Sequence, residues 1–573
     1  MTFTPPTTEQ KFLLKHIVRL DEIAGHNAFA EASSDVAEAI VDGAGAFAAG
    51  EFAPLNRVGD TVGARWSPEG VAMPAGFAEA YRAYVEAGWG TLSGPQGYGG
   101  QGLPFTLATV VMEDLGAANM AFSLIMMLTP GAVEALAHHG SEELKATWLP
   151  KLITGEWNGT MNLTEPQAGS DVGALKTRAE PQGDGSYRIK GQKIYITYGE
   201  HDMTDNIVHL VLARLPDAPP GTKGISLFLV PKFLLDADGR PGKFNDVRCV
   251  SIEHKLGIHA SPTCVMSFGD DDECIGWLIG EENRGMAAMF TMMNNARLNV
   301  GLQGVSIAER ATQAAVAYAK ERIQGVRPGG ASGARIIEFP DVRRMLLRMK
   351  ALTQAARALT YYAAGQVDRA SLGGGAAKKR ADLLTPLVKA YGTDIGVEVA
   401  SLGVQVHGGM GFVEETGAAQ HYRDARIAPI YEGTNGIQAA DLVGRKLGLD
   451  GGAVLAGLIS DIRDGSSGHP HLAALADACD RVAARLMAAG ADDRLAASYP
   501  FLNMLAAATA GWLMAEQLRA LEGEALDPHF AAMKRAAAAF YLEQLVPEAL
   551  GLEAAATATA EQLYAVPEDA FAA

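Results

Sequence analysis

A block of short β-rich segments between two long helical stretches most constrains the fold of this chain. Short runs that are rich in apolar and β-branched residues lie within 159–270, and Gly- and Asp-containing turns separate them. These runs are 187–197, 207–214, 225–230 and 264–268. Before and after the block, at 75–152 and 284–447, apolar residues recur at the helical period. The pattern therefore predicts an all-β domain between helical domains.

Glycine-rich breaks and helix-start residues divide the helical stretches. The stripe of apolar residues at 10–23 predicts one helix, and 299–323 predicts a long one. Asp341 is predicted to be the N-cap of a further helix. The segments 93–102 and 325–333 contain too many glycines for a helix and are predicted loops.

The chain ends in an alanine-rich segment, 450–573, that carries two apolar stripes at helical spacing. The stripes are Leu472, Leu475, Cys479, Val482 and Leu486, and Phe530, Met533, Ala537 and Phe540. At 573 residues the chain is too long for one core, so several domains are expected. The predicted divisions are a lead-in at 1–50, an N-terminal helical domain at 51–158, a middle β domain at 159–283, a helical domain at 284–449 and an extra helical domain at 450–573.

The bulk composition excludes several classes of protein. Apolar residues make up 48% and charged residues 20%, and the formal charge of −18 argues against broad binding to nucleic acid. The four cysteines are far apart without a C-x-x-C pair, so we expect no metal site and no disulfide framework. The first residues show no secretory signal, and no apolar run approaches the roughly 18 residues of a membrane span. We therefore expect a cytoplasmic protein without a membrane span.

A carboxylate stands in a short, glycine-punctuated segment near the end of the second helical stretch. The segment is 429–436 (PIYEGTNG), with Glu432 between the apolar residues 427–430 and a predicted helix at 437–443. Apolar surroundings raise the pKa of a carboxyl group because they disfavour its charged form, and a pKa near neutrality suits a general base. A helix-start glutamate stabilised by the helix dipole is the alternative. This segment alone does not decide between the two.

Two further motifs decide the matter. Residues 161–172 (MNLTEPQAGSDV) are followed by 191–197 (GQKIYIT), far upstream of 430–434 (IYEGT). One such motif is a weak indication, but the three in this order resemble the acyl-CoA dehydrogenase family, the flavoproteins that desaturate acyl-CoA thioesters. The resemblance extends from about residue 67 to residue 447.

The resemblance implies a multidomain α+β fold with an N-terminal α-helical domain, a middle β-barrel domain and a C-terminal four-helix bundle, here followed by the extra helical domain. It implies FAD as the cofactor and α,β-dehydrogenation of an acyl-CoA to the trans-2-enoyl-CoA. In the family a glutamate removes the α proton and flavin N5 accepts the β hydrogen as hydride. The backbone N–H of this glutamate and a ribityl hydroxyl stabilise the enolate oxygen. Glu432 matches this glutamate.

Further positions match the cofactor and substrate contacts of the family. The matches to flavin contacts are Met161, Leu163, Thr164, Ser170, Tyr195, Thr197, Arg322, Gln405, Gly409 and Thr434. The matches to substrate contacts are Ser170, Arg297, Tyr431 and Gly433. Arg322 matches an arginine that reaches the flavin diphosphate of the neighbouring subunit. The resemblance therefore implies a flavin site shared between subunits.

The sequence departs from the family pattern at three places. Tyr195 stands where the family usually has Trp; it keeps an aromatic plane, and an ordinary aromatic on a strand face is the alternative. Many members have an aromatic residue three positions after the arginine that Arg322 matches, but this chain reads Gln324-Gly325-Val326 there, so the usual adenine contact lacks its side chain. Gly436 replaces a glutamine of the family.

Four other polar residues have competing interpretations. Glu165 is the second carboxylate in a matched motif, and we interpret it as structural because Pro166 fixes a turn. Arg297 matches an arginine near the catalytic carboxylate, although an arginine at a helix start is often only a solvated charge. His259 and His407 are interpreted as hydrogen-bonded structural histidines.

The segments 255–264, 276–277 and 292–297 narrow the resemblance to large bacterial members with an extra C-terminal domain, which include 3-methylmercaptopropionyl-CoA dehydrogenases. We therefore expect 3-methylmercaptopropionyl-CoA or a related short or medium acyl-CoA as substrate and electron-transfer flavoprotein as partner. We also expect a homodimer, in which the segment 450–573 replaces the second dimer of tetrameric members; alternatively, this segment adds to a tetramer interface or forms part of the acyl pocket. The alternatives are an acyl-CoA oxidase that uses O₂ and a catalytically silent acyl-CoA-binding protein. The presence of Glu432 argues against the silent protein.

Overall fold

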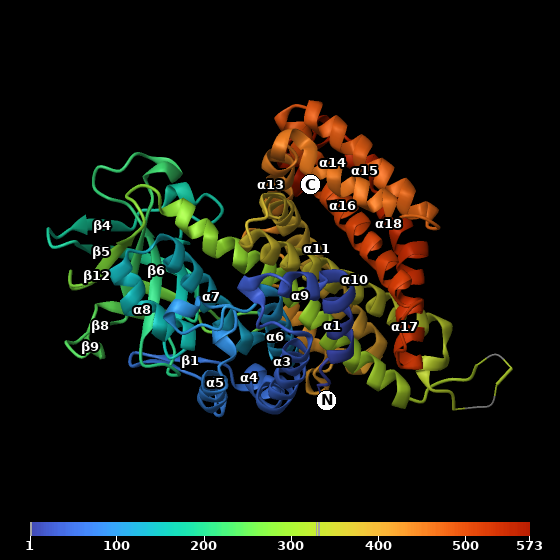
Figure 1. The fold of residues 1–573 in the computed structure, drawn as a ribbon, viewed down its shortest axis with the longest axis horizontal. Coiled ribbons are helices and arrows are strands. Elements are labelled where there is room, and N and C mark those ends of the chain that lie inside the picture. The colour runs from blue at the N-terminus through green and yellow to red at the C-terminus, as the bar shows by residue number, and fades with distance from the viewer. Residues whose placement is uncertain (1–2, 328, 331–332) are drawn as a thin grey trace. The chain divides into compact units, whose positions relative to one another are not determined.

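The computed structural model describes residues 3–327, 329–330 and 333–573, which form two compact units. The central unit is Ala39–Ala296, and the helical unit joins Phe3–Glu38 to Arg297–Ala573. The chain passes between them within helix α3 (Ser34–Phe47) and again within helix α9 (Gly285–Glu321). Figure 1 follows the elements along the chain by colour.

The helices of the central unit precede its main strands. They are α4 (Asn56–Val62), α5 (Phe77–Glu86), α6 (Phe105–Ala118), α7 (Met120–His139) and α8 (Glu142–Thr154). Asn119 caps α7, because its side chain accepts a hydrogen bond from the Phe122 amide at 3.1 Å. Ser141 caps α8 in the same way, from the Leu144 amide at 3.2 Å. Gly155, with φ of 82°, ends α8.

Helix α7 corrects the expectation that no apolar run approaches the length of a membrane span. Among the described residues it is the one helix that is long and apolar enough to cross a membrane by length and composition. However, 83% of its most apolar stretch is buried inside the protein, and it packs on α6, α8 and strand β3 (Asn158–Asn162). A core helix passes the same test, so this helix is weak evidence for a membrane span.

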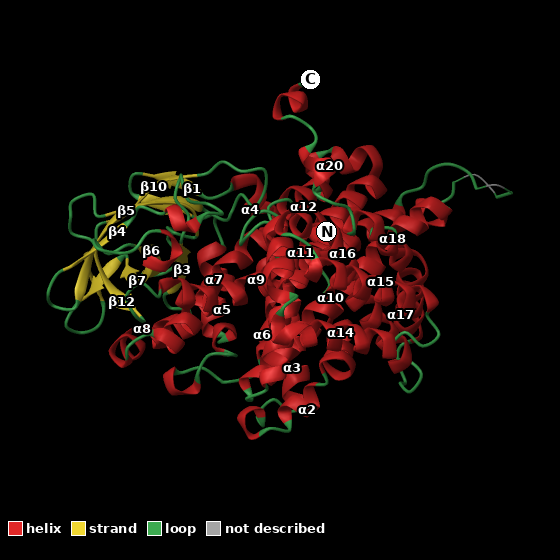
Figure 2. Ribbon diagram, turned by 90° about the horizontal axis from the view of Figure 1, so that it is seen from above, coloured by secondary structure: helices red, strands yellow, loops and turns green. Residues whose placement is uncertain are grey.

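An eight-stranded sheet follows the helices in the described part of the central unit (Figure 2). Besides β3, its strands are β4 (Arg178–Pro181), β5 (Ser186–Thr197), β6 (Ile207–Ala213), β7 (Ser226–Pro231), β10 (Val247–Ile252), β11 (Thr263–Phe268) and β12 (Ile275–Ile279). The strand order is β10-β11-β5-β12-β7-β6-β3, with β4 also paired to β5. Only β3 and β6 run parallel among these pairs. All four predicted β runs are strands. The short pairs β1 (Arg65–Ser67) with β2 (Gly70–Ala72) and β8 (Phe233–Leu235) with β9 (Pro241–Phe244) lie outside this sheet.

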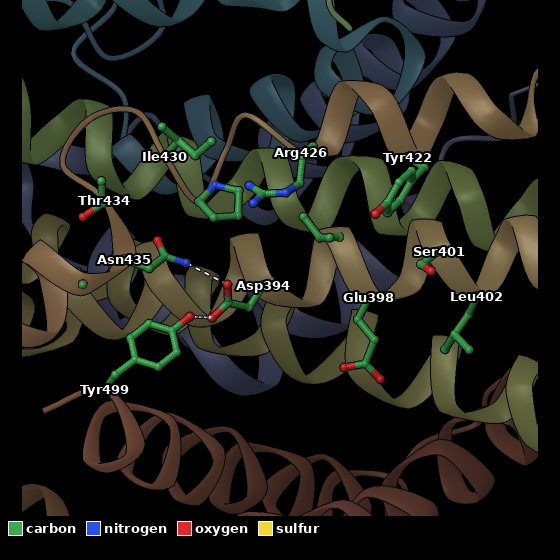
Figure 3. A pocket seen from close by; sticks show the side chains of 13 residues that line it. Asp394, Glu398, Ser401, Leu402, Tyr422, Arg426, Ile430, Thr434, Asn435 and Tyr499 are labelled. Carbon is green, nitrogen blue, oxygen red and sulfur yellow. Dashed lines mark hydrogen bonds between the residues drawn. The ribbon is translucent and has the colours of Figure 1, made fainter. Parts of the chain in front are cut away.

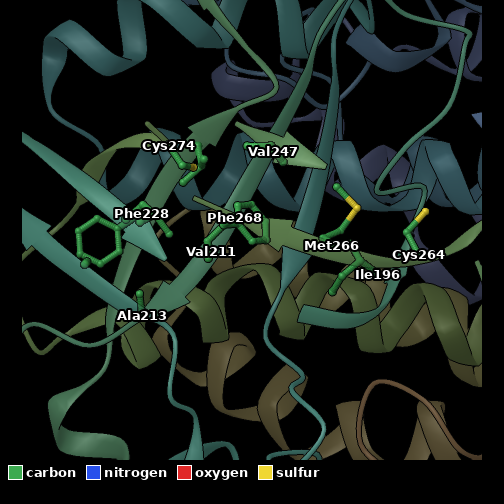
Figure 4. Close-up of a cluster of buried hydrophobic side chains, with 12 residues drawn as sticks. Ile196, Val211, Ala213, Phe228, Val247, Cys264, Met266, Phe268 and Cys274 are labelled. Atoms are coloured by element: carbon green, nitrogen blue, oxygen red, sulfur yellow. The ribbon is translucent and has the colours of Figure 1, made fainter. Parts of the chain in front are cut away.

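Strand β5 lies between the two halves of this sheet, β10-β11 on one side and β12-β7-β6-β3 on the other, and both halves share one apolar core. Its first half pairs with β12 and β4, and its second half pairs with β11. Ile189 and Ile196 of β5, Phe228 of β7, and Met266 and Phe268 of β11 are each at most 2% exposed and belong to this core (Figure 4). The core therefore draws side chains from both halves.

The helical unit contains long helices and the extra C-terminal helices. They are α1 (Thr7–Leu13), α2 (Leu20–Ala24), α10 (Pro340–Ser371), α11 (Gly375–His407), α12 (Ala418–Ala425), α13 (Asn435–Asp441), α14 (Ala453–Asp464), α15 (Pro470–Ala488), α16 (Ala491–Ala520), α17 (Pro528–Phe540), α18 (Val546–Leu550), α19 (Glu553–Ala556) and α20 (Glu561–Tyr564). Helices α10 and α11 pack along each other, and α16 contacts both of them and α13. Together with the Arg297–Glu321 part of α9, these helices form the framework of the candidate site.

The extra helices bury the predicted stripes. The five members of the first stripe, on α15, are at most 2% exposed, which confirms the prediction. Of the second stripe, Ala537 and Phe540 are buried and the other two members are half-buried. Polar contacts tie the same helices to α10 and α11: Arg348 pairs with Glu548 at 2.7 Å and Arg380 with Asp461 at 2.8 Å.

Three local predictions differ from the structure. The predicted helix at 10–23 is interrupted by a π-helical turn, Leu14–Val18, and by Arg19 with φ of 54°. Asp341 is not an N-cap: Phe339 occupies that position, Pro340 fills the first helical position, and Asp341 instead follows in the first turn. The long helix predicted at 299–323 begins earlier, at the start of α9. Of the predicted loop 325–333, residues 328, 331 and 332 lie outside the described residues.

Candidate active site

Glu432 lies in a strained turn between α12 and α13. Its backbone is left-handed, with φ of 56°, and φ of the following Gly433 is 81°. A left-handed conformation costs a non-glycine residue about 1–2 kcal/mol, and it persists only where the surroundings impose it. Here the Asn435 amide donates to the Pro429 carbonyl at 3.0 Å, which closes the loop around Glu432. The turn therefore fixes where the carboxylate leaves the backbone.

The start of α13 holds the other side of the turn. The Thr434 side chain caps the helix by accepting from the Ile437 amide at 3.2 Å. The Gln438 side chain donates to the carbonyls of Glu432 and Gly433 at 3.3 and 3.2 Å. A Cβ at Gly433 would lie 2.9 Å from the Gln438 amide nitrogen, and this side chain would have to shift to make room. The positive φ of Gly433 is the stronger reason for glycine at this position.

Glycines let two long helices cross closely beside this turn. A Cβ at Gly304 of α9 would lie 1.9 Å from the Gly392 carbonyl oxygen of α11. A Cβ at Gly392 would lie 2.5 Å from the Gly301 carbonyl oxygen. The backbones therefore touch. Residues near the crossing, Arg297 on α9 and Lys389 on α11, both act electrostatically on Glu432.

The pKa of Glu432 is raised to about 7 because burial disfavours its charged form, and the cations of Arg297 and Lys389 only partly oppose this. No described residue donates a hydrogen bond to its carboxylate, whereas such bonds would lower the pKa. The apolar approach to the turn predicted the direction of the shift. A carboxyl group with this pKa can accept and release a proton near neutral pH.

Lys389 is the second titrating group of the site. Its side chain is fully buried, and its ammonium donates to Asn435 Oδ1 at 2.9 Å. Burial lowers its pKa to about 7, against the opposing effect of the Glu432 and Asp394 carboxylates. Burial likewise lowers the pKa of the Arg297 guanidinium, which is 7% exposed and is stabilised by Asp441 and Glu432.

Tyr431 comes directly before Glu432, and a hydrogen bond to helix α9 anchors its side chain. Its hydroxyl donates to Gln303 Oε1 on α9. Burial raises the pKa of the Tyr431 phenol, so it stays protonated at all physiological pH values. Tyr431, Gly433 and Thr434 lie in the same turn as Glu432, and Arg297 acts electrostatically on its carboxylate.

A second group of matched residues lies in the central unit, where β3 ends beside β5. The Ile194 amide donates to the Thr164 carbonyl at 2.9 Å, and Lys193 Nζ donates to the Leu163 carbonyl at 3.1 Å. Met161 is the buried last-but-one residue of β3. These contacts bring the first two motifs together.

Tyr195 and its neighbours follow a bulge in β5. Cys264 pairs with Ile196 and Met266 with Lys193, so β5 has one extra residue there. Tyr195 has φ of 61°, and its ring is 60% exposed. Thr197 stands two residues further along the strand, and Ser170 is exposed in the loop after Glu165.

The remaining matched residues lie at helix ends of the helical unit. Arg322 follows α9, Gln405 lies in the last turn of α11, and Gly409 lies in the 3₁₀ turn Gly408–Phe412. All three are exposed. No hydrogen bond or ion pair between described residues joins them to the turn of Glu432. The resemblance assigns Arg322 to the site of a neighbouring subunit.

Family profiles match most of the sequence. They are described as the N-terminal domain (34–156), the middle domain (160–270) and the C-terminal domain (283–447) of acyl-CoA dehydrogenase, and as "Acetyl-CoA dehydrogenase C-terminal like" (469–567). The chain belongs to the acyl-CoA dehydrogenase family. It is thus an enzyme of the acyl-CoA dehydrogenase type, a flavoprotein oxidoreductase whose cofactor is FAD.

Relatives match the chain over nearly its whole length. 3-Methylmercaptopropionyl-CoA dehydrogenase of Ruegeria pomeroyi is 46% identical, and the match covers 98% of this chain and 99% of that protein. A butyryl-CoA dehydrogenase of Syntrophomonas wolfei is 35% identical, over 99% of this chain and 98% of that protein. An acyl-CoA dehydrogenase of Bacillus anthracis, solved with FAD, has the same fold, with a TM-score of 0.73 at 23% identity over 94% of this chain and 90% of that one.

The residues of the central unit fit a flavin. The exposed Tyr195 ring offers an aromatic plane, and the bulge with its left-handed backbone turns this residue out of the regular strand. Beside it, Thr164 is half-buried, and its hydroxyl has no hydrogen-bond partner among the described residues. These are groups that can stack on and hydrogen-bond to a polar aromatic ring system.

His259 and His407, which the sequence left between a catalytic and a structural role, both make hydrogen bonds to backbone carbonyls. Nδ1 and Nε2 of His259 lie 2.8 and 3.1 Å from the carbonyls of Asp60 and Lys255. His407 Nδ1 lies 2.7 Å from the Gly403 carbonyl, and the ring stacks on Tyr318. Both histidines are therefore hydrogen-bonded structural residues in this acyl-CoA dehydrogenase.

The sequence interpretation missed several residues that shape the site. They are Lys389, Asp394, Asn435, Gln303 and Gln438. A charged residue such as Lys389 among apolar positions of a long helix could have been recognised as a buried cation. The paired glycines 301 and 304 could have indicated a close helix crossing.

Proposed function

We propose that this enzyme removes the α proton of an acyl-CoA thioester with the Glu432 carboxylate, in the α,β-dehydrogenation to the trans-2-enoyl-CoA. The observation that carries the proposal is a glutamate in an imposed left-handed turn, with a pKa raised to about 7 by burial and no described hydrogen-bond donor on its carboxylate. Such a group is fixed in place and is free to take a proton. FAD, when bound, supplies the two-electron acceptor for the β hydrogen.

The same residues position the reacting groups. The Glu432 backbone N–H donates to no backbone carbonyl among the described residues, so it remains available to stabilise a thioester oxygen as negative charge develops. Arg297 and Lys389 add positive charge near the base, and this favours the ionised form before reaction. Tyr431 and Gly433 flank the base and are proposed substrate contacts.

We propose flavin contacts in each of the two units, each taken by itself. Those in the central unit are Met161, Leu163, Thr164, Ser170, Tyr195 and Thr197, and those in the helical unit are Arg322, Gln405, Gly409 and Thr434. Ser170 also contributes to the substrate site. Arg322 supplies a guanidinium to the diphosphate, in a charge-assisted contact across a subunit interface.

The proposed substrate is 3-methylmercaptopropionyl-CoA or a related short or medium acyl-CoA. Supporting this, the relative named for that substrate is 46% identical over the whole chain, and a second relative is named for butyryl-CoA. The test is anaerobic bleaching of the flavin by a panel of acyl-CoAs that includes both compounds and longer chains. Fast bleaching by a short or medium member supports the proposal, and no bleaching by any member refutes the reaction.

Electron-transfer flavoprotein is the proposed electron acceptor. To test this, the enzyme is first reduced anaerobically with its substrate and is then mixed with air, with or without electron-transfer flavoprotein. Slow reoxidation that electron-transfer flavoprotein accelerates supports a dehydrogenase, whereas fast reoxidation with formation of peroxide identifies an oxidase. We also propose a cytoplasmic location.

We propose a homodimer in which the extra helices take the place of a second dimer. Helices α14 to α18 cover part of α10 and α11 in the helical unit, through Arg348–Glu548, Arg380–Asp461 and the hydrogen-bonded hydroxyls of Tyr391 and Tyr541. A surface covered in this way is not available to another dimer. Light scattering of the full-length holoenzyme tests the proposal, and a tetramer in solution contradicts it.

A further inference from the structure

A line of polar contacts leads from the extra C-terminal domain to the turn of Glu432. Tyr499, on α16, donates its hydroxyl to Asp394 Oδ2 on α11. Asp394 Oδ1 in turn accepts from Asn435 Nδ2 at 2.8 Å. Figure 3 shows these three side chains on the wall of a pocket of about 660 Å³, with dashed lines for both hydrogen bonds. The contacts therefore join three helices that are far apart in the sequence.

Asn435 is the link between this line and the catalytic turn. It is 4% exposed, and its backbone amide closes the loop around Glu432 by donating to the Pro429 carbonyl. Its side chain lies between opposite charges: Oδ1 accepts from the Lys389 ammonium at 2.9 Å, and Nδ2 faces Asp394. An amide oxygen accepts and an amide nitrogen donates, so these two charges fix the orientation of the side chain.

The charges of Asp394, Lys389 and Glu432 influence one another's pKa values. The Asp394 carboxylate favours the charged form of Lys389, and the Lys389 ammonium favours the charged form of Glu432. Burial raises the pKa of Asp394, while the hydrogen bonds from Tyr499 and Asn435 and the charges of Lys389 and Arg426 oppose the rise.

The other charges around Glu432 come from α9, from the end of α13 and from the π-helical turn that follows it, Leu442–Lys446. Arg297 favours the carboxylate directly, and Asp441 and Arg445 act on Arg297. These groups do not contact Tyr499. A change at Tyr499 therefore reaches Glu432 through Asp394 and Lys389 and leaves the Arg297 side unchanged.

From these contacts we infer that Tyr499 of the extra C-terminal domain is a positioning residue for the catalytic turn, acting through Asp394 on Asn435 and Lys389. The inference rests on the proposed role of Glu432 as the base. It gives the extra domain a part in catalysis, since the domain supplies a hydroxyl whose hydrogen bond favours the charged form of Asp394 beside the turn.

Tyr499→Phe in the full-length holoenzyme tests this inference. Loss of the hydroxyl favours protonation of Asp394, and Lys389 then loses its proton more readily, so the pKa of Glu432 rises. We expect the acid limb of the pH profile for flavin bleaching to move up by about half a unit, which is roughly a 3-fold loss of rate below the midpoint. Asp394→Asn should move the limb in the same direction by at least as much. Tyr499→Phe on top of Asp394→Asn should add nothing.

A second measurement does not depend on the reaction. Hydrogen exchange of the holoenzyme, followed in peptides that cover residues 429–441, should be several-fold faster in Tyr499→Phe because Asn435 is held less firmly. Tyr541→Phe is the matched control. It removes a hydroxyl of the extra domain that contacts α11, at Tyr391, but it does not touch Asp394. Tyr541 is buried, whereas Tyr499 is 37% exposed, so the control is the more disruptive of the two changes to packing. We expect wild-type exchange at 429–441 and a wild-type pH profile for this control.

The outcomes separate the inference from the proposed function. Wild-type exchange at 429–441 in Tyr499→Phe overturns the inference, and so does an equal effect of Tyr541→Phe, because the domain would then act by general packing. A wild-type pH profile in a bleaching-competent Tyr499→Phe also overturns it. Absence of bleaching in the wild type refutes the reaction, and the exchange measurement still decides the role of Tyr499 in holding the turn.

Discussion

Glu165 in the central unit and Glu432 in the helical unit each lie near a buried lysine, and their pKa shifts are opposite. Burial alone would raise the pKa of Glu165, but the Lys193 ammonium at 2.8 Å and several hydrogen bonds lower it to about 2. The pKa of Glu432 is instead raised to about 7 by burial, although Lys389 and Arg297 are near.

Hydrogen bonds account for the difference. The carboxylate of Glu165 accepts from the amides of Lys176 and Thr177 at 2.7 and 3.0 Å, and from the Thr177 hydroxyl at 2.6 Å. Such bonds stabilise the charged form, so this glutamate is a permanent anion that ties β3 to β5. Glu432 is near cations but has no described donor on its carboxylate. A buried charge pair is thus structural when its acceptors are satisfied, and it remains able to titrate when they are not.

The largest expected effect is on the rate of Glu432→Gln. The variant should retain FAD and bind acyl-CoA, yet lose roughly 10²–10⁴-fold in the rate of flavin bleaching, because general-base catalysis contributes about that much. Stopped-flow absorbance of the holoenzyme with its best acyl-CoA measures the loss. Glu415→Gln, at an exposed position in the same domain, is the control and should have the wild-type rate. Near wild-type bleaching by Glu432→Gln would show that another group is the base.

The corresponding change at Glu165 should affect stability. Glu165→Gln leaves the Lys193 charge buried without its counterion, and breaking such a pair lowers the free energy of unfolding by roughly 3–5 kcal/mol. Denaturant unfolding at pH 7 measures this, and Glu432→Gln should change the free energy of unfolding far less. The contrast fails if both variants lose the same stability.

The acid dependence of that stabilisation has a definite sign. Since the folded pKa of Glu165 lies below its unfolded value of about 4.3, its contribution is complete above about pH 4.3 and is lost as the pH falls towards about 2. The difference in unfolding free energy between wild type and Glu165→Gln should therefore shrink on acidification through this range.

The wild-type rate should depend on pH through Glu432. The carboxylate form is the base, so the rate of bleaching should rise with pH through a midpoint near 7 and reach a plateau above it. About one unit below the midpoint the rate should be roughly a tenth of the plateau value. Stopped-flow rates from pH 5.5 to about 9 test this. A rate that is flat from about pH 5 to 8 would mean that the base titrates like an ordinary glutamate.

The smallest of these effects concerns Lys389→Met. Loss of the ammonium removes a charge that favours ionised Glu432, so the midpoint should rise by about half a unit to one unit, a roughly 3- to 10-fold loss of rate below it. Lys379→Met is the matched control, since Lys379 lies on the same helix but pairs with Asp450 in a solvent-exposed contact. An unchanged midpoint in Lys389→Met would mean that Arg297, and not Lys389, is the cation that favours the charged form of Glu432.

The sequence predicts the features that depend on local pattern. The 3–4 spacing in α15 predicted its buried face correctly, because each residue in such a pattern has the same kind of environment. The four β-rich runs were likewise recognised as strands from their local composition. The turn of Glu432 was recognised from neighbouring residues, which also supply the apolar surroundings that raise its pKa. Local pattern failed for α1, where a π-helical turn and Arg19 interrupt the apolar stripe.

The sequence did not predict the partners that tune the site. Tyr499 and Asp394 are 105 positions apart, and Lys389 and Asn435 are 46 apart. Their contacts exist only because α11, α13 and α16 pack together, and no local pattern encodes such a meeting. The bulge at Tyr195 was missed for the same reason, since it is defined by the register between β5 and β11.

A buried ion pair has a consequence for how this protein is made. Lys534 Nζ of α17 lies 2.7 Å from Glu9 Oε1 of α1, and both side chains are almost completely buried. The two residues are 525 positions apart, and at the usual rate of translation they leave the ribosome roughly 30–100 s apart. During this interval the first helix of the chain waits without its counterion, while the contiguous central unit can already fold. Helix α1 is therefore secured in its final place only after α17 has been made, although it is synthesised long before.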